Sequence, residues 1–375
     1  MKFLFFLGNR AGLLQEVFTA DDLPLPLSGW GGPRRIYGTF VEVFRQLFLT
    51  KGKIDLVICD RAEYCPAAWI LSRMLGVELV VMAGGDLHGE SKPSRKVDIL
   101  ARLPGIQIFS HILVAIFRRC NFVTNSRYLA EAYAKNYGME QTTVIHRGVK
   151  VEEFDHYSKT SARMHLKLAP FPDNPDFDRR DQRLIMSATN FRYVDKARGM
   201  VDILPDMDRL LKEYPDLVWI VAGKGPWLET FRRIVKDKIE HSDRVRFPGH
   251  VHLPLYIAAC EFFVHCSHLD GYPRVILEAQ AQSKPVIGNR AVGVTEMIRH
   301  GETGFLIGPD DSFHDCAKRL LDDPELLQSI GKKARAHVAE FNDPARIGRQ
   351  WRILLEKIMN KKGRLSTVDS PDASL

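Results

Sequence analysis

The stretch from His265 to Ile307 constrains the fold more than any other part of the chain, because it predicts two successive strand–turn–helix units. Residues 261–267 form a short apolar strand, and 269–273 (LDGYP) form a turn in which glycine relaxes φ and proline ends the strand. Helix-forming residues follow that proline over 274–282. A second strand (KPVIGN) and a second helix over 294–301, which ends at a glycine, complete the stretch.

Two carboxylates give this stretch its chemistry. Asp270 lies in the loop after the first strand, and Glu278 lies eight residues later in the following helix. A loop that feeds a helix N-terminus presents free backbone N–H groups and the positive end of a dipole, which suit a diphosphate. Carboxylates beside it accept hydrogen bonds from sugar or ribose hydroxyls. The acid pair is also compatible with an ordinary strand–helix unit that carries an acid in its loop.

The same stretch resembles the acid-x7-acid motif of glycosyltransferase family 4, which comprises retaining enzymes that use nucleotide-sugar donors. The chain has D-G-Y-P-R-V-I-L-E-A-Q-A-Q-S-K-P-V-I and then G-V-T-E-M-I-R-H-G-E-T-G-F-L, without gaps relative to the family pattern. It departs from that pattern at Asp270, where Glu is usual, and at Ser283, where Gly is usual. The resemblance implies that Asp270 orients the donor sugar and that Glu278 holds the nucleotide ribose. The remaining donor contacts that it implies in this stretch are Gly271, Tyr272, Pro273 and Arg274.

Composition sets broader limits. The 375 residues suggest about two domains, and 45% of them are hydrophobic, which is enough for two cores. The sequence has no run of eighteen uncharged apolar residues, and its apolar start is too short for a signal peptide. The six cysteines lack zinc-type spacing, so free thiols in a reducing cytosol are expected. A net charge of +7 suits an anionic donor or membrane, and no basic–aromatic motif indicates nucleic acid.

Residues 1–157 alternate strands with helices, which predicts a mostly parallel sheet. By resemblance this is the family's acceptor-side domain, through the glycine pair Gly31–Gly32, the pair Asn125–Ser126, and the closing pattern over 145–154. The family often has a His-Gly at the end of the third strand, near the reacting sugar. Here the chain has Gly84-Gly85-Asp86 and then His88, so the candidates there are Asp86 and His88. A glycine turn with solvated polar residues explains them equally well.

Residues 158–183 are rich in proline and charge and predict a linker. The second domain is expected over 184–345. Its segment NFRYVDKARGM resembles the family's phosphate-binding element, an Arg and a Lys-Gly separated by four or five residues, with Arg192 and Arg198 in the two cationic places. Lys196 is an alternative contact, and a solvated run of charges is the competing explanation. We expect Arg198→Ala to weaken donor binding by about 2 kcal/mol. Gly223, in A-G-K-G-P, either passes near the nucleotide or serves only as a turn.

The resemblance therefore implies an α/β protein of two facing Rossmann-like, doubly wound domains, the GT-B arrangement. A helix over 346–362 is expected to cross back to the first domain, and a polar tail over 363–375 is expected to be disordered.

The function expected is transfer of a hexosyl group, with retention, from a nucleotide-diphosphate sugar to a saccharide or lipid-linked acceptor in glycan synthesis. Asp-x-Asp triplets occur only at 176–178 and 206–208, outside the stretches expected to bind the donor. A metal-independent reaction without a cofactor is therefore expected, with arginines and a helix N-terminus stabilising the leaving diphosphate. A GT-B epimerase or phosphorylase would share the fold, but the acid-x7-acid loop argues against it. A non-catalytic nucleotide-sugar binder is the alternative that Asp270 and the displaced histidine leave open.

The apolar segment 106–119 suggests where the acceptor comes from. Basic residues precede it at 92–96 (KPSRK) and close it at Arg118–Arg119. This pattern suits a cytoplasmic protein that contacts an anionic membrane peripherally, and hence a lipid-linked acceptor. A helix simply buried against the sheet is the competing explanation.

Overall fold

The computed structural model describes residues 3–6, 54–60, 65–84, 104–166 and 182–360. These residues divide into two compact units. Unit 1 is built from 1–86, 99–148 and 344–375, and unit 2 from 87–98 and 149–343. Several predicted features lie outside the described residues, namely the Gly31–Gly32 pair, Asp86, His88, the basic segment 92–96 and the tail 363–375.

Unit 1 contains a parallel sheet in the order β1-β2-β3-β4-β5. Most of the strands are short apolar runs, and successive strands are joined by long connections, several of them helical, as parallel pairing requires. The strands are β1 (Phe3–Phe6), β2 (Leu56–Cys59), β3 (Glu78–Ala83), β4 (Asn121–Thr124) and β5 (Thr142–Val144). The helices between them are α3 (Cys65–Leu75), α5 (Pro104–Phe117) and α6 (Arg127–Tyr137).

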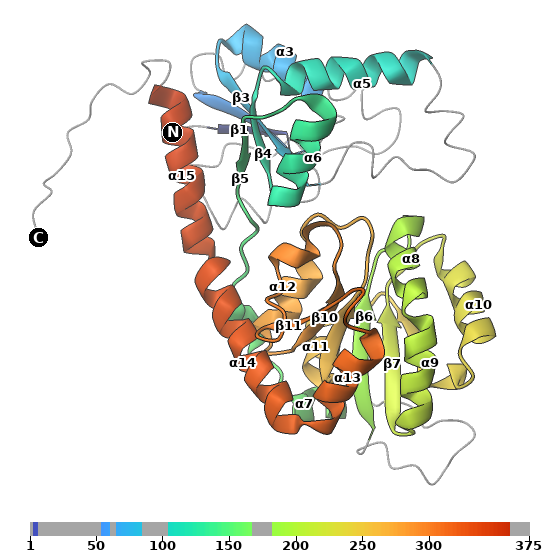
Figure 1. Cartoon of the computed structure of the whole chain (residues 1–375). Helices are drawn as coiled ribbons and strands as arrows, with labels where there is room; N and C mark the ends of the chain where they lie inside the picture. The colour runs from blue at the N-terminus through green and yellow to red at the C-terminus, as the bar shows by residue number, and fades with distance from the viewer. Residues whose placement is uncertain (1–2, 7–53, 61–64, 85–103, 167–181, 361–375) are drawn as a thin grey trace, which may run out of the picture. The chain divides into compact units, whose positions relative to one another are not determined.

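The last helix of the chain, α15 (Pro344–Asn360), belongs to unit 1 (Figure 1). Its buried face packs against alternate residues of the unit 1 strands. This face consists of Ile347, Trp351, Leu355 and Ile358, which recur at helical spacing. The prediction that the terminal helix returns to the first domain is confirmed.

Unit 2 contains a six-stranded parallel sheet in the order β11-β10-β9-β6-β7-β8. The strands are β6 (Arg183–Ala188), β7 (Leu217–Ala222), β8 (Val245–Gly249), β9 (Phe262–His265), β10 (Val286–Asn289) and β11 (Gly304–Ile307). Successive residues of one strand enter different cores, since Ile185 joins one cluster and Met186 the other. The sheet is therefore covered on both faces, as a doubly wound fold requires.

The helices of unit 2 are divided between these two cores. One core includes residues of α8 (Val194–Asp202), α9 (Leu204–Glu213), α10 (Leu228–Lys238) and α13 (Phe313–Asp322). The other includes residues of α7 (Lys159–His165), α11 (Leu253–Ala259) and α12 (Arg274–Ala281). The long helix α14 (Pro324–Phe341) contributes Ile330 to the first core and Val338 to the second.

Two local features differ from the sequence prediction. The helix expected over 294–301 is instead a 3₁₀ turn, η5 (Val292–Glu296), because the chain must reverse at Gly301 to begin β11 at Gly304. The segment expected to be a linker begins with α7, whose Ala162 is fully buried in unit 2. Accordingly, the division between the units falls at residues 148 and 149 rather than at 157 and 158.

Candidate functional site

The carboxyl ends of β6 and β9 define the place in unit 2 where a ligand is expected. The chain begins this sheet with β6, adds β7 and β8 on one side, and then adds β9, β10 and β11 on the other. Open parallel sheets bind ligands outside the carboxyl ends of the strands at such a switch in strand order. The loop after β6 leads into α8 and the loop after β9 leads into α12, so these loops frame the candidate site.

Asp270 lies in the β9–α12 loop between two basic side chains. Nζ of Lys196, in the first turn of α8, is 2.5 Å from its Oδ1 atom, and Nε2 of His265, the last residue of β9, is 3.3 Å from its Oδ2 atom. His265 Nε2 makes no aligned hydrogen bond with the described residues, so its contact with Asp270 is electrostatic. The structure thus brings the predicted acid together with Lys196, the alternative cation of the sequence prediction.

Two opposing effects set the charge of Asp270. Burial of its side chain, which is 14% exposed, raises the pKa of the carboxyl group, whereas the His265 ring and the Lys196 ammonium lower it. The basic neighbours prevail, so the pKa of Asp270 lies well below its usual range. The site therefore holds a fixed carboxylate anion at neutral pH.

Close backbone approach holds the site loops together. A Cβ atom on Gly199 of α8 would lie 2.5 Å from the backbone of Cys266, and one on Gly293 would lie 1.4 Å from the Gly271 carbonyl oxygen. The His268 N–H also donates to the Asp195 carbonyl at 3.3 Å. Only glycine fits at the two close approaches, which fix α8 and η5 against the loop that carries Asp270.

The N-termini of α8 and α12 lie next to the site loops and, within the described segments, lack side-chain caps, as do those of α9, α10 and α11. α8 begins after Tyr193 and α12 after Pro273, and no side chain among the described residues caps either N-terminus. By contrast, α6, α13 and α14 are capped by Ser126, Ser312 and Asp323. The first N–H groups of α8 and α12, together with the helix dipoles, favour a bound anion such as a diphosphate.

The two predicted arginines occupy less enclosed positions than Lys196. The Arg192 guanidinium lies 5.8 Å from the Tyr193 ring centre, and the Lys196 ammonium lies 6.0 Å from the same ring. The Arg198 side chain is 65% exposed and pairs with Asp195 at 3.0 Å. The structure therefore places Arg192 and Lys196 around Tyr193, while Arg198 lies at the surface.

Glu278 lies on α12, one turn beyond Arg274. Arg274 Nε donates to its Oε1 atom at 3.0 Å, and the Glu278 side chain is mostly buried. Burial raises the pKa of Glu278, and the Arg274 guanidinium opposes that rise without cancelling it. The second acid thus differs from Asp270, whose pKa is lowered.

The other predicted donor contacts have visible structural roles. The buried Tyr272 hydroxyl accepts a hydrogen bond from Asn342 Nδ2 at 2.9 Å, which ties the site loop to the end of α14. A Cβ atom on Gly223 would lie 1.9 Å from the Thr189 carbonyl oxygen, so the loop after β7 must pass directly beside the loop after β6. Gly271 and Pro273 form the turn before α12.

The sequence did not predict a role for His265, nor for the hydrogen-bonded pair Ser267 and Asn289. Asn289, at the end of β10, accepts a bond from the Ser267 N–H and donates to the Ser267 carbonyl, each at 3.0 Å. These bonds join the carboxyl ends of β9 and β10. Their positions could have identified them, because His265 and Asn289 are polar residues near the carboxyl ends of predicted apolar strands.

Unit 1 has its own polar cluster at the carboxyl ends of β4 and β5. With the Asn125 amide oriented so that its oxygen accepts, Nε and Nη2 of Arg147 each lie 3.1 Å from that oxygen. Ser126, predicted beside Asn125, accepts from the Leu129 N–H and caps α6. The resemblance identified this pair, and the structure adds Arg147 to it.

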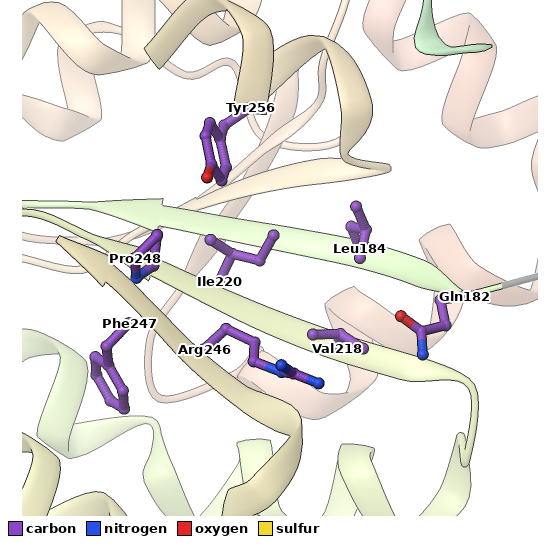
Figure 2. A pocket seen from close by; sticks show the side chains of 8 residues that line it. All are labelled: Gln182, Leu184, Val218, Ile220, Arg246, Phe247, Pro248 and Tyr256. Atoms are coloured by element: carbon purple, nitrogen blue, oxygen red, sulfur yellow. The ribbon is translucent and has the colours of Figure 1, made fainter. Parts of the chain in front are cut away.

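A separate hollow lies on the sheet face of unit 2, away from these strand ends (Figure 2). Its volume is about 240 Å³, and it is lined by Gln182, Leu184, Val218, Ile220, Arg246, Phe247, Pro248 and Tyr256. In Figure 2, Tyr256 lies across from Leu184 and Ile220. None of the predicted site residues lines this hollow. Within the described segments, no group of three His, Cys, Asp or Glu side chains is arranged to hold a metal ion.

Comparison with solved structures identifies the fold class. The chain is similar to HepE of Anabaena, solved in complex with UDP and glucose, with a TM-score of 0.72, 18% identity, and coverage of 95% of this chain and 98% of that one. Sucrose-phosphate synthase from Thermosynechococcus elongatus gives a TM-score of 0.68 and 20% identity, over 90% of this chain and 82% of that one. These two-unit α/β structures have the GT-B fold, and so does this protein.

Sequence comparison identifies the family. Residues 178–337 match the family described as Glycosyl transferases group 1. N-acetyl-alpha-D-glucosaminyl L-malate synthase of Bacillus anthracis is 29% identical over 189 residues, which is 49% of this chain and about half, 48%, of that protein. D-inositol 3-phosphate glycosyltransferase of Streptomyces bingchenggensis is 29% identical over 345 residues, 87% of this chain and 70% of that protein. Unit 2 therefore contains the group 1 glycosyltransferase domain, and the chain is similar to a glycosyltransferase over most of its length.

Proposed function

We propose that the protein transfers a hexosyl group from a nucleotide-diphosphate sugar to an acceptor hydroxyl and retains the anomeric configuration. The observation that carries this proposal is Asp270, a buried carboxylate held by Lys196 and His265 at the switch point of the sheet. Two uncapped helix N-termini at the same strand ends supply the anion-binding half of the site.

Each residue of the site has a role in the proposed reaction. The N-termini of α8 and α12 bind the diphosphate, with Lys196, Arg192 and Arg198 as the cationic side chains near it. Glu278 accepts hydrogen bonds from the ribose hydroxyls, and Asp270 accepts them from the donor sugar. From the sequence, Asp86 and His88 are the residues of the acceptor-side domain that are candidates for contact with the reacting sugar.

The chemical step requires no protein nucleophile. The bond between the anomeric carbon and the diphosphate oxygen breaks, and the acceptor oxygen bonds to that carbon on the same face. The acceptor proton passes to the departing diphosphate oxygen, so atoms and charge balance. Negative charge grows on the leaving diphosphate, where fixed cations and backbone N–H groups are most effective. This account needs neither a cofactor nor a metal.

The acceptor proposed is a saccharide or a lipid-linked saccharide in glycolipid, lipopolysaccharide or other glycan synthesis. The six cysteines are free and most are buried, which supports a reducing, cytoplasmic location. None of the described helices has the length and apolar character needed to cross a membrane. Peripheral contact with the cytoplasmic membrane face is therefore the form of membrane association proposed.

A panel of nucleotide sugars tests the proposal, beginning with UDP-glucose because HepE has been solved in complex with it. We expect release of nucleoside diphosphate from at least one donor, and a product whose anomeric configuration matches that donor by NMR. Binding of a donor by calorimetry without turnover, with or without a mixed acceptor extract, would identify the protein as a non-catalytic nucleotide-sugar binder.

A further inference from the structure

Helices α3 and α5 of unit 1 lie side by side (Figure 1). Both helices expose large apolar side chains. Ile70 and Met74 on α3 are 38% and 52% exposed, and Ile112 on α5 is 47% exposed. The other large apolar side chains with comparable exposure, Tyr128, Met164 and Ile353, lie on three separate helices. Among the residues whose burial the structure describes, three of the six exposed large apolar side chains therefore lie on this helix pair.

Helical spacing separates this outer surface from the core. On α3, Ile70 and Met74 are four residues apart and exposed, whereas Ala68 and Leu71 are buried. On α5, the exposed Ile112 and Ala115 alternate with the buried Leu113, Ile116 and Phe117. Each helix therefore lies flat, with one apolar stripe in the core and a second apolar stripe facing outward.

The charges on this surface have a single sign. Neither α3, α5 nor the residues 118–120 that follow α5 contain Asp or Glu. The exposed arginines are Arg73, Arg118 and Arg119. Two of them are held in place, since Arg118 Nε donates to the Tyr137 carbonyl at 2.7 Å and the Arg73 guanidinium lies 5.6 Å from the Trp69 ring centre. Exposed helices elsewhere, such as α10 and α14, carry charges of both signs.

We propose that the outward face of α3 and α5, formed by Ile70, Arg73, Met74, Ile112 and Arg119, docks on an anionic lipid membrane. Exposed apolar side chains enter the boundary between headgroups and acyl chains, while the arginines contact the lipid phosphates. The arginines make an anionic surface the best partner for these two helices, which contain no acidic residue. A cationic partner would be repelled, and a neutral partner would gain no electrostatic attraction. This inference locates the membrane contact included in the proposed function, and its test does not depend on sugar transfer.

Sedimentation of the full chain with vesicles tests the proposal. The probes are phosphatidylcholine vesicles with and without phosphatidylglycerol, free of any sugar donor or acceptor. We expect binding to the anionic vesicles that weakens as salt is added. Arg73→Gln and Arg119→Gln should each reduce the partition coefficient about fivefold, in line with the energy of one basic residue at an anionic surface.

Matched substitutions elsewhere on the chain provide the controls. Ile112→Glu should reduce vesicle binding about tenfold or more, because it removes an inserted side chain and adds a repelled charge. Met164→Glu and Ile353→Glu place the same charge at apolar positions outside the surface that are more exposed than Ile112, and they should leave binding unchanged. Arg352→Gln controls for the loss of one positive charge from the chain as a whole.

Three outcomes would overturn the proposal. The first is the absence of binding to anionic vesicles, and the second is an equal loss of vesicle binding for Ile112→Glu and Ile353→Glu. The third is self-association that Ile112→Glu abolishes, because that result would assign the surface to a second copy of the chain. Donor hydrolysis in solution is measured on the same variants. If Ile112→Glu loses vesicle binding and retains hydrolysis, the surface and the transfer reaction are distinct properties.

Discussion

Two carboxylates flank strand β9: Glu261 directly precedes the strand, and Asp270 lies in the loop that follows it. At the amino end, Glu261 is 7% exposed, pairs with Lys159, and accepts from Arg163 Nη2 at 2.8 Å. At the carboxyl end, Asp270 pairs with Lys196 and His265. Each acid has two basic partners, so the carboxylate alone does not mark the functional end.

The surroundings distinguish the two ends. Lys159 and Arg163 both come from α7, and the Glu261 N–H donates to the Leu184 carbonyl at 2.7 Å, so the amino-end cluster fastens a helix to the sheet. In a parallel sheet the helix N-termini lie instead at the carboxyl ends of the strands. There the N-termini of α8 and α12 lack side-chain caps among the described residues. The comparison teaches that similar ion clusters act as an anchor or as a ligand site according to which helix ends face them.

The largest difference is expected from neutralising the carboxylate at the functional end. Asp270→Asn should reduce turnover about 10³-fold, roughly 4 kcal/mol of transition-state stabilisation, because a fixed anion at the donor sugar is lost. Its effect on unfolding should be smaller than its effect on turnover. Steady-state kinetics and urea unfolding of the same samples measure both. Turnover within tenfold of the native value would remove Asp270 from the reaction.

The corresponding substitution before β9 tests whether Glu261 joins α7 to the sheet. Glu261→Gln should lower the free energy of unfolding by about 2 kcal/mol, less than for a fully enclosed ion pair because the Lys159 side chain is 45% exposed. Turnover should change by no more than about twofold, since distant sites act independently. Urea denaturation provides the measurement. A large loss of turnover at unchanged stability would show that the two ends are not distinct.

Calorimetry on two neighbouring cations sharpens the assignment of the phosphate contact. The sequence predicts a loss of about 2 kcal/mol in donor affinity for Arg198→Ala, whereas the position of Lys196 predicts a loss of that size for Lys196→Ala. Titration with a nucleoside diphosphate ranks the two variants directly. Unchanged affinity in both would exclude the first turns of α8 from phosphate binding.

The opposite pKa shifts of the two site acids predict a specific pH dependence. The pKa of Glu278 is raised by burial, so Glu278 becomes protonated at a higher pH than an ordinary glutamate, whose pKa is about 4.3. Nucleotide affinity should therefore fall on the acid side before Asp270 begins to titrate. Arg274→Ala removes the group that lowers this pKa and should move the fall to higher pH, while Arg274→Lys should not. Superimposable affinity–pH profiles would contradict this role of Glu278.

The smallest effect is expected from chelation. Because Lys196, Arg192 and two helix N-termini supply positive potential at the functional end, turnover should be unchanged in EDTA. Assay of the donor found by the panel, before and after chelation, measures this. Loss of turnover that magnesium or manganese restores would contradict the charge account.

The sequence predicted the frame of unit 2 because its strands are apolar runs bounded by turn residues. β9 and α12 lie within two residues of their predicted ends. The helix predicted over 294–301 was wrong, since its periodicity gave no sign that Gly293 must approach the Gly271 carbonyl. The structure also explains why the family pattern has glycine where this chain has Ser283. The residue has a φ of 57°, a conformation in which glycine is less strained.

The site was less predictable than the fold. Asp270 and Glu278 could be found because their spacing lies within one continuous stretch, whereas the contact of His265 with Asp270 depends on how the loop folds back on β9. The choice between Lys196 and Arg198 likewise depends on which side of α8 faces that loop. Such contacts are set by tertiary packing, which a local pattern does not encode.

The position of α15 has a consequence for how the protein is made. The core of unit 1 combines Leu56, Val80 and Ile145 with Trp351 and Leu355, which the ribosome adds some two hundred residues after the last strand of that unit. Unit 2 is contiguous over 149–343 and can fold during synthesis, whereas the sheet of unit 1 waits for the final helix with one apolar face exposed. Until then the nascent chain offers that face to chaperones, and a chain released before residue 344 would contain one complete unit and one open sheet.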